Sequence, residues 1–269
     1  MTLMARVLSA AGAFVCLVLA GCGGDGNETA SPPAQAEPPP IETTASGATI
    51  EGPIGRGASE VYLFRPSGRP RAIVVFGHGW GDITPVKYRP WMDHLLAGNV
   101  AVIYPRYQPS PDPPVGEPRE VVKRAFRQGI DAAFERLGDP DVPVVATGFS
   151  YGAVMAYYYA GKAAGWGRPV PRAVQIIFPA RSFGEPLPSF PKRTRVLIQA
   201  GDRDEVVGAA GADLLWLLVE SHPRQLKQYE VVRSRGGFVA SHLAPQGTSA
   251  AAQRAFWKPL DDLIDAAVG

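Results

Sequence analysis

Residues 142–161 read VPVVATGFSYGAVMAYYYAG, and this stretch decides which fold the chain can adopt. The β-branched apolar run 142–147 predicts a fully buried strand, and the small and aromatic residues from Ala153 onward predict a buried helix. The pentapeptide GFSYG, residues 148–152, lies between them, on the turn from strand to helix. The pattern therefore places Ser150 at a tight strand-to-helix turn.

The pentapeptide matches the pattern G-x-S-x-G, and its position gives that pattern a chemical meaning. In a nucleophile elbow the turn holds the serine in a strained backbone conformation, and the two glycines let neighbouring backbone pass close by. The hydroxyl of Ser150 then stands at the N-terminus of a helix, whose amides favour developing negative charge. We interpret Ser150 as a nucleophile because a buried strand precedes the motif and a helix follows it.

This combination of strand, motif and helix resembles the α/β-hydrolase superfamily, and within it the serine hydrolases of the esterase, lipase and dienelactone-hydrolase kind. The resemblance covers residues 61–267, nearly the whole of the domain that follows the N-terminal segments. It implies an α/β fold with a mostly parallel central sheet and helices on both faces. It also implies a serine hydrolase, most simply a carboxylesterase or a lipase-like enzyme.

A second motif follows another predicted central strand. The apolar run 72–76 leads directly into GHGWGD, residues 77–82. In the family that the chain resembles, an H-G segment at this point forms one side of the oxyanion hole. The resemblance implies that the backbone N–H groups of Trp80 and Tyr151 are the two donors to the oxyanion. His78 is expected to shape this loop by hydrogen bonding and not to act as a base.

The acid and the base are implied by two later loops. The strand predicted at 195–200 ends in GDRDEVV, and the G-x-x-D spacing after this strand implies Asp204 as the acid. Asp202 competes with it, but its expected role is turn chemistry, accepting backbone amides two residues further on. The glycine-rich segment 236–241 leads to His242, which matches the family's final loop and implies His242 as the base.

The chain order Ser150, Asp204, His242 is that of α/β-hydrolases and differs from the order in the chymotrypsin and subtilisin classes. His242 would take the serine proton during attack, while Asp204 would fix the imidazole tautomer and stabilise the imidazolium. The implied reaction is hydrolysis of a carboxylic ester through an acyl-enzyme intermediate. Peptidase, thioesterase and acyltransferase reactions use the same triad and stay open, as does a non-catalytic ligand-binding protein on the same fold.

The composition limits other classes of function. A chain of 269 residues, 46% apolar, suits one large α/β domain, and a net charge of +2 with scattered basic residues leaves no footprint for nucleic acid. The two cysteines, Cys16 and Cys22, both lie near the start, and the four histidines are dispersed. We therefore expect no metal, no cofactor and no obligate protein partner, and a small-molecule or polymer-borne ester as the substrate.

The N-terminus predicts export. Residues 1–21 contain the apolar run 7–20, which is too short for a membrane span and fits a signal peptide. The run ends in LAGC, which resembles the signal of bacterial lipoproteins and implies lipidation of Cys22. We expect a protein anchored through Cys22 to the bacterial cell membrane or the outer membrane. Residues 22–48 are predicted to form a flexible linker and residues 49–269 the hydrolase domain.

Two further expectations concern the shape of this domain. Residues 208–221 predict a helix in which four leucines pack inward: Leu214, Leu215, Leu217 and Leu218. His222, after this helix, is expected to be solvated or to cap the helix. Residues 179–192, between two predicted strands, are too few for a cap domain. We therefore expect a site open to solvent, which favours accessible, bulky or polymer-borne esters.

Overall fold

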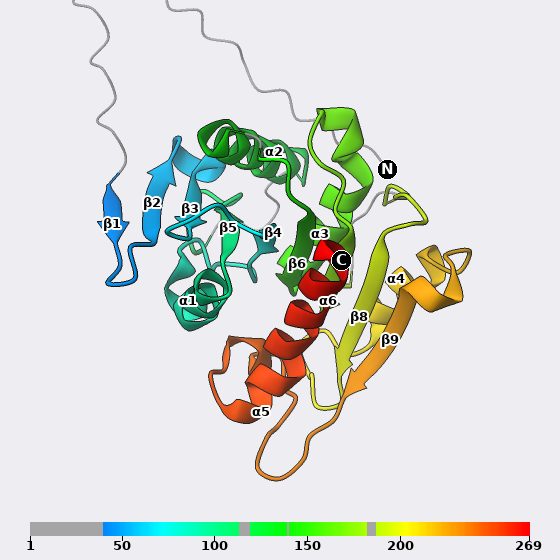
Figure 1. Cartoon of the computed structure of the whole chain (residues 1–269). Helices are drawn as coiled ribbons and strands as arrows, with labels where there is room; N and C mark the ends of the chain where they lie inside the picture. The colour runs from blue at the N-terminus through cyan, green and yellow to red at the C-terminus, as the bar shows by residue number, and fades with distance from the viewer. Residues whose placement is uncertain (1–39, 113–118, 139, 182–186) are drawn as a thin grey trace, which may run out of the picture. The chain divides into compact units, whose positions relative to one another are not determined.

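The computed structural model describes residues 40–112, 119–138, 140–181 and 187–269, which fall in the unit Pro38–Gly269. The predicted signal peptide 1–21, Cys22 and the linker up to residue 39 lie outside the described residues, so these stay predictions. Figure 1 shows the described part as one central sheet with helices packed against it.

The described residues form a nine-stranded sheet with the order β1-β2-β3-β5-β4-β6-β7-β8-β9 (Figure 1). Its strands are β1 (Ile41–Thr43), β2 (Thr49–Ile54), β3 (Val61–Arg65), β4 (Ala72–Gly77), β5 (Val100–Pro105), β6 (Val144–Phe149), β7 (Ala173–Ile177), β8 (Arg195–Gly201) and β9 (Lys227–Val232). Antiparallel pairing joins β1 to β2, β2 to β3 and β3 to β5, and every pair from β5 onward to β9 in this order is parallel. The sheet is therefore mostly parallel, as the sequence predicts.

The centre of the sheet consists of β5, β4, β6 and β7, and every residue in these four strands is buried. β4 and β6 lie side by side, with Gly77 opposite Gly148. Because parallel strands end at the same edge, His78 and Ser150 leave the sheet at neighbouring points. β6 ends at Phe149, directly before Ser150, which confirms the predicted strand with a shift of two residues.

Helices cover both faces of the sheet (Figure 1). They are α1 (Arg89–Ala97), α2 (Arg119–Leu137), α3 (Tyr151–Lys162), α4 (Ala210–Leu218), and α5 (Ala250–Ala252), which continues through the π turn η6 (Gln253–Trp257) into α6 (Lys258–Val268). Phe126 of α2, Val154 of α3 and Leu215 of α4 share one hydrophobic core. Trp91 of α1 and Ile264 of α6 belong to the other. Successive side chains of a strand point to opposite faces, so the central strands supply both cores.

The sheet begins earlier than the domain boundary predicted at residue 49. β1 pairs with β2 through Ile41 opposite Glu51, and the turn between the strands closes with the Thr44 N–H donating to the Ala48 carbonyl at 2.8 Å. All three residues of β1 are exposed. This strand is held by backbone hydrogen bonds at a sheet edge and carries no apolar alternation, so composition alone indicated a linker over residues 41–48.

The predicted packing of the α4 leucines is wrong for three of the four. Leu215 is buried, whereas Leu214, Leu217 and Leu218 are 44%, 65% and 47% exposed. The helix packs through a face of smaller residues, because a Cβ at Gly211 would lie 2.1 Å from the Pro179 carbonyl oxygen. That close approach turns the opposite side of α4, with the three leucines, to solvent.

His222 is also placed differently from the expectation of a solvated residue. It is buried, and its Nε2 lies 2.6 Å from the carbonyl oxygen of Thr194, the residue before β8. Its ring packs edge-on against Phe190, with the ring centroids 5.7 Å apart. His222 therefore ties the segment after α4 to the start of β8.

The π turn is attached to the sheet by two buried glutamines. Gln175 of β7 donates to the Gln199 side-chain oxygen at 3.0 Å and to the Phe256 carbonyl at 2.9 Å. Gln199 of β8 donates to the Ala255 carbonyl at 2.9 Å. A π turn leaves carbonyl groups without the usual helical donor, and these side chains supply donors from the sheet.

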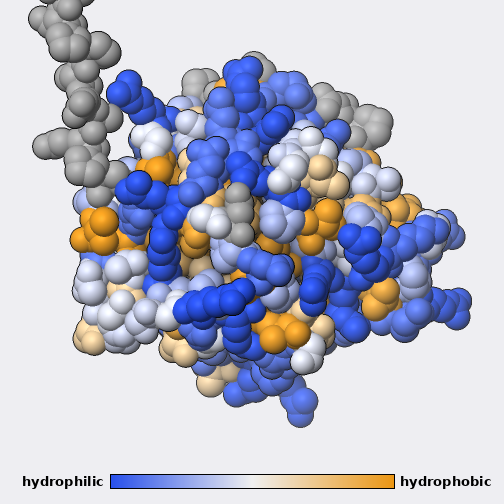
Figure 2. All heavy atoms as spheres, turned by 45° about the horizontal axis from the view of Figure 1, so that its top comes forward, coloured by the Kyte–Doolittle hydropathy of each residue, from blue (hydrophilic) through white to orange (hydrophobic). Residues whose placement is uncertain are grey.

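The molecular surface is mixed in character. On the face shown in Figure 2, hydrophilic side chains predominate, and apolar residues appear between them in small separate areas. Ion pairs join distant parts of the chain, such as Arg168 with Asp131 at 2.7 Å and Arg71 with Asp265 at 2.7 Å. The charges of both signs are therefore interspersed, in line with the net charge of +2.

Candidate active site

The turn after β6 brings three backbones into direct contact. Ser150 has φ 56° and ψ −119°, a positive-φ conformation that non-glycine residues rarely adopt. A Cβ on Gly148 would lie 2.1 Å from the Gly152 carbonyl oxygen, and a Cβ on Gly152 would lie 2.1 Å from the Gly77 carbonyl carbon. The close approach expected around the motif is therefore made by Gly77, at the end of β4.

The structure brings together the three side chains that the sequence predicts as a triad. His242 Nε2 lies 3.0 Å from Ser150 Oγ, and His242 Nδ1 lies 2.8 Å from Asp204 Oδ2. The three residues follow β6, β8 and β9, at the edge where parallel strands end. Ser150 and Asp204 are buried, and the side chain of His242 is 11% exposed.

The carboxylate of Asp204 is stabilised in its charged form. Burial raises the pKa of this group, but hydrogen bonds from His242, Val207 and Val206 lower it further than burial raises it, and the net pKa lies below the usual range. The Val206 and Val207 N–H groups donate to Asp204 Oδ1, both at 3.0 Å. A carboxylate facing Nδ1 keeps the proton there, which leaves Nε2 free to accept the proton of the Ser150 hydroxyl.

The turn role that the sequence predicts for Asp202 is performed by Asp204, in addition to its contact with His242. Asp204, not Asp202, accepts amides from residues just after it. Asp202 instead accepts hydrogen bonds from the N–H and hydroxyl of Ser234, at 3.0 and 2.6 Å. The Ser234 hydroxyl oxygen in turn accepts a hydrogen bond from the Ala240 N–H at 3.0 Å. Asp202 therefore fastens the loop that leads to His242, a role that depends on residues more than thirty positions away.

The side chains of Trp80 and Tyr151, the two residues predicted to supply the oxyanion donors, contact each other. The N–H groups on either side of Trp80 are occupied: Gly79 donates to Tyr88 Oη at 3.3 Å, and Gly81 to Gln108 Oε1 at 2.9 Å. The Trp80 N–H itself donates to no group among the described residues. Tyr151 is the first residue of α3 and directly follows Ser150. The Trp80 and Tyr151 rings pack edge to face, with centroids 4.9 Å apart.

His78 holds the loop 77–82 through hydrogen bonds, as the sequence predicts. Its ring is fully buried, with Nδ1 2.7 Å from the Gly79 carbonyl oxygen and Nε2 2.7 Å from the Arg106 carbonyl oxygen. It stacks on Tyr107, with centroids 4.0 Å apart and planes 7° apart, and Tyr107 Oη donates to the His78 carbonyl. Burial lowers the pKa of His78 to about 4, although the two carbonyls raise it in part.

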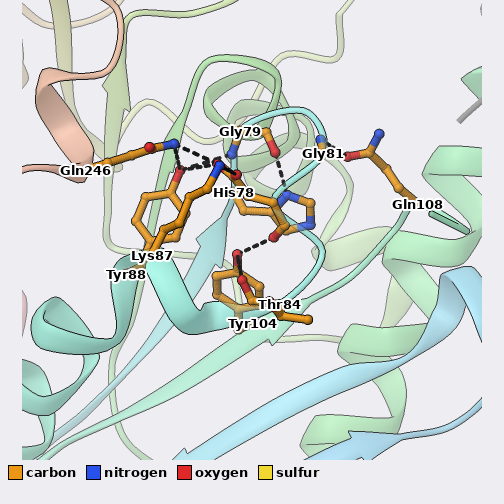
Figure 3. A network of polar contacts seen from close by, with 10 residues as sticks. His78, Gly79, Gly81, Thr84, Lys87, Tyr88, Tyr104, Gln108 and Gln246 are labelled. Atoms are coloured by element: carbon orange, nitrogen blue, oxygen red, sulfur yellow. Dashed lines mark hydrogen bonds and ion pairs between the residues drawn. The ribbon is translucent and has the colours of Figure 1, made fainter. Parts of the chain in front are cut away.

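A polar network around the buried side chain of Asp82 was not predicted from the sequence. Three of its members, Lys87, Tyr88 and Gln246, are labelled in Figure 3. The carboxylate accepts hydrogen bonds from Tyr88 Oη at 2.9 Å and Gln246 Nε2 at 2.8 Å, and forms an ion pair with Lys87 Nζ at 2.5 Å. The sequence shows Asp82 at the end of the GHGWGD motif. Its partner Gln246 lies 164 residues further on, and no local pattern connects the two.

Apolar side chains also stay exposed in the segments that carry the predicted site residues. The exposed fractions are 45% for Trp80, 66% for Val206, 55% for Val239 and 62% for Leu243. Trp80 belongs to the loop 77–82, Val206 follows Asp204 by two residues, and Leu243 follows His242 directly. The site is therefore bordered by several segments that present apolar surface to solvent.

No group of three or more His, Cys, Asp or Glu side chains in the described ranges is arranged to hold a metal ion. Within the same ranges, no helix combines the length and the apolar composition needed to cross a membrane.

Comparison with known proteins assigns the fold. No protein-family model and no curated protein matches the sequence. Carboxyl esterase 2 from the fungus Tuber melanosporum is similar, with TM-score 0.60, 15% identity, and coverage of 83% of this chain and 89% of that chain. Esterase B from Lactobacillus rhamnosis, solved with a tributyrin phosphonate inhibitor, has TM-score 0.58 and 13% identity, covering 81% of this chain and 85% of that one. A thermostable esterase from Pseudomonas putida has TM-score 0.54 and 16% identity, covering 86% and 84%. The chain has the α/β-hydrolase fold.

The buried ring of His78 predicts a dependence of stability on pH. Its pKa of about 4 in the folded protein lies below the ordinary value of 6.5, so between these values the unfolded chain binds a proton that the folded protein does not. The free energy of unfolding is therefore not reduced by this group above pH 6.5. It declines as the pH falls toward 4, by about 3 kcal/mol in total. Denaturant unfolding from pH 7.5 to 4.5 measures this decline, and a His78→Asn variant is expected to have a shallower one.

NMR titration of the His78 ring gives the matching observation without a substitution. The ring is expected to stay neutral at pH 5.5. A ring that is already charged at pH 7, together with a stability that does not change between pH 7 and 5, would contradict the prediction. It would mean that both ring nitrogens donate to the Gly79 and Arg106 carbonyls.

Proposed function

We propose that this protein is a serine hydrolase that cleaves carboxylic esters through an acyl-enzyme intermediate, with Ser150, His242 and Asp204 as its catalytic triad. The observation that carries the proposal is the continuous hydrogen-bonded chain from Asp204 through His242 to Ser150 Oγ. A neutral serine hydroxyl is a weak nucleophile and needs an adjacent base, and this base is oriented by a third group. The esterases among the structures with this fold agree with such an activity.

The reaction follows from the geometry. Ser150 Oγ attacks the ester carbonyl carbon while its proton passes to His242 Nε2. The carbonyl oxygen becomes an oxyanion, which accepts hydrogen bonds from the backbone N–H groups of Trp80 and Tyr151. Collapse of this intermediate breaks the bond to the alcohol oxygen, which takes the proton from His242. Water then attacks the acyl-serine with His242 as base, and the carboxylic acid and the free Ser150 hydroxyl are released.

Labelling with a fluorophosphonate tests the nucleophile directly. We expect the purified full-length protein to be labelled at Ser150, because an activated serine attacks phosphorus as it attacks a carbonyl. The Ser150→Ala variant is expected to show no labelling, and mass spectrometry of the labelled peptide identifies the site. A panel of soluble esters, thioesters and amides then distinguishes ester hydrolysis from the other reactions of this triad.

The two aspartates supply a matched control for the acid. Asp204→Asn is expected to lower kcat by about 10⁴-fold, because an amide at this position favours the wrong imidazole tautomer. Asp202→Asn removes a charge at a neighbouring position that contacts Ser234 and not the imidazole, and it is expected to have a much smaller effect on kcat.

A folded wild-type protein that the fluorophosphonate does not label would favour a ligand-binding role on the same fold.

The proposal includes a preference for esters with an apolar chain. The exposed Val239 and Leu243 belong to the loop of His242, so they can contact a substrate chain that extends from the reacting carbonyl over the surface. We expect Leu243→Ser to lower kcat/KM for p-nitrophenyl octanoate about fivefold, from about 1 kcal/mol of lost apolar contact, with little change for p-nitrophenyl acetate. Leu217→Ser is the control, because Leu217 is 65% exposed and lies on α4. Equal effects on both esters would argue against this preference.

We also propose that the protein is exported and tethered to a membrane through lipidated Cys22. The support is the sequence LAGC after an apolar run, followed by a segment rich in Gly, Pro, Ser and Thr. Metabolic labelling of a bacterial expression host with a clickable fatty acid is expected to label the wild-type protein in the membrane fraction. A Cys22→Ser variant should lose the label, and a wild-type protein that remains unlabelled would remove the tether from the proposal.

A further inference from the structure

Asp82 is a buried charge that receives donors from two separate parts of the chain. Its side chain is 3% exposed, and three groups surround it: Lys87 and Tyr88 from the turn η2 (Pro85–Tyr88), and Gln246 from the turn η5 (Ala244–Gln246). A buried carboxylate costs free energy unless its lone pairs are satisfied. Burial and the charge of Asp82 raise the pKa of Tyr88, so Tyr88 stays protonated and donates. Lys87, Tyr88 and Gln246 are labelled in Figure 3.

On one side the network fixes the loop 77–82, which carries the proposed oxyanion donor Trp80. Tyr88 Oη donates to Asp82 and accepts the N–H of Gly79, and Tyr104 Oη donates to the Asp82 carbonyl. The loop is therefore held at Gly79 and at Asp82, on both sides of Trp80. A peptide group clamped in this way has little freedom to rotate, so the direction of the Trp80 N–H is set by the network.

On the other side the network fixes the loop of the base. Gln246 Nε2 donates to Asp82 Oδ2 from a turn that starts two residues after His242. The Ala244 N–H donates to the Ser241 carbonyl and the Gln246 N–H to the Leu243 carbonyl, both at 3.0 Å. These turns make residues 241–246 one hydrogen-bonded segment, so a restraint on Gln246 is also a restraint on His242.

We propose that Asp82 and Gln246 are positioning residues, which hold the oxyanion donor Trp80 and the base His242 in a fixed relation through one shared carboxylate. The inference rests on the proposed function, and it adds residues that touch neither the substrate nor the reacting atoms. It assigns the two hydrogen bonds of Gln246, to Asp82 Oδ2 at 2.8 Å and to Tyr88 Oη at 3.4 Å, the task of keeping two catalytic elements aligned. Small displacements of such elements are enough to reduce the rate of the chemical step.

The first test compares two glutamines in the full-length protein. Gln246→Ala removes the hydrogen bond to Asp82. We expect it to lower kcat for p-nitrophenyl acetate about tenfold with little change in KM. This loss is smaller than the loss caused by removing an oxyanion donor outright. Gln253→Ala is the control, because exposed Gln253 donates to the Thr248 carbonyl and lies outside the network. Wild-type kcat in the Gln246→Ala protein would overturn the proposal.

The Gln246→Glu variant separates positioning from simple stabilisation. The introduced carboxyl faces Asp82, and while it keeps its proton it can donate to Asp82 as the glutamine does. Loss of that proton places two carboxylates together and repels the loops. We expect kcat near the wild-type value at low pH and a decline at a pH where the wild-type kcat is level. A kcat profile parallel to that of the wild type would show that Gln246 serves stability alone.

Hydrogen exchange gives a readout that needs no catalytic activity. In Gln246→Ala, the peptides that contain residues 79–82 and 241–243 are expected to exchange faster together, while peptides of the central strands keep their protection. If these peptides exchange faster in Gln246→Ala but the wild-type protein hydrolyses no ester, the network couples the loops and the proposed function fails. Unchanged exchange at residues 79–82 would overturn the coupling, whatever the activity of the protein.

Discussion

The contact between the backbones of Gly77 and Gly152 is the constraint on which the rest of the site depends. A Cβ on Gly152 would lie 2.1 Å from the Gly77 carbonyl carbon and 2.3 Å from the His78 carbonyl oxygen. Only at this separation can the end of β4 and the start of α3 meet, because any side chain at Gly152 would push them apart. The contact also brings the loop that follows β4 close to Ser150. The strained conformation of Ser150 and the position of Trp80 are thus consequences of the same close packing.

The loops around the site are held by buried polar groups, because they lie beyond the end of the sheet and have no ladder of hydrogen bonds. Asp82 accepts side-chain donors from two turns, and His78 lies between the carbonyls of Gly79 and Arg106. Asp202, which is exposed, binds Ser234 and so fixes the loop before His242. Asp82 and His78 are costly to bury alone, and each repays that cost only when all its partners are in place. The loops are consequently ordered as one assembly.

How much could be predicted depended on whether a signal was local. The strand-turn-helix around Ser150 was predicted because apolar runs and glycines occur within twenty residues of it. The packing of α4 was predicted incorrectly, since four leucines in the sequence do not show that Gly211 makes the closest contact. Asp202 was given the turn role that Asp204 performs, because both have the same local spacing to backbone amides. The burial of His222 depends on Thr194, which lies 28 residues away.

The sequence by itself determined the order of the central strands along the chain, the elbow at Ser150 and the choice of Asp204 and His242 as its companions. These features follow from apolar periodicity, from glycine at close approaches and from motifs that a known family shares. Only the tertiary structure decided that Asp82 meets Gln246, that Asp202 holds Ser234, and that three leucines of α4 face solvent. The physical reason is that a hydrogen bond between distant residues depends on how loops fold back over the sheet edge. A one-dimensional pattern contains no record of that path.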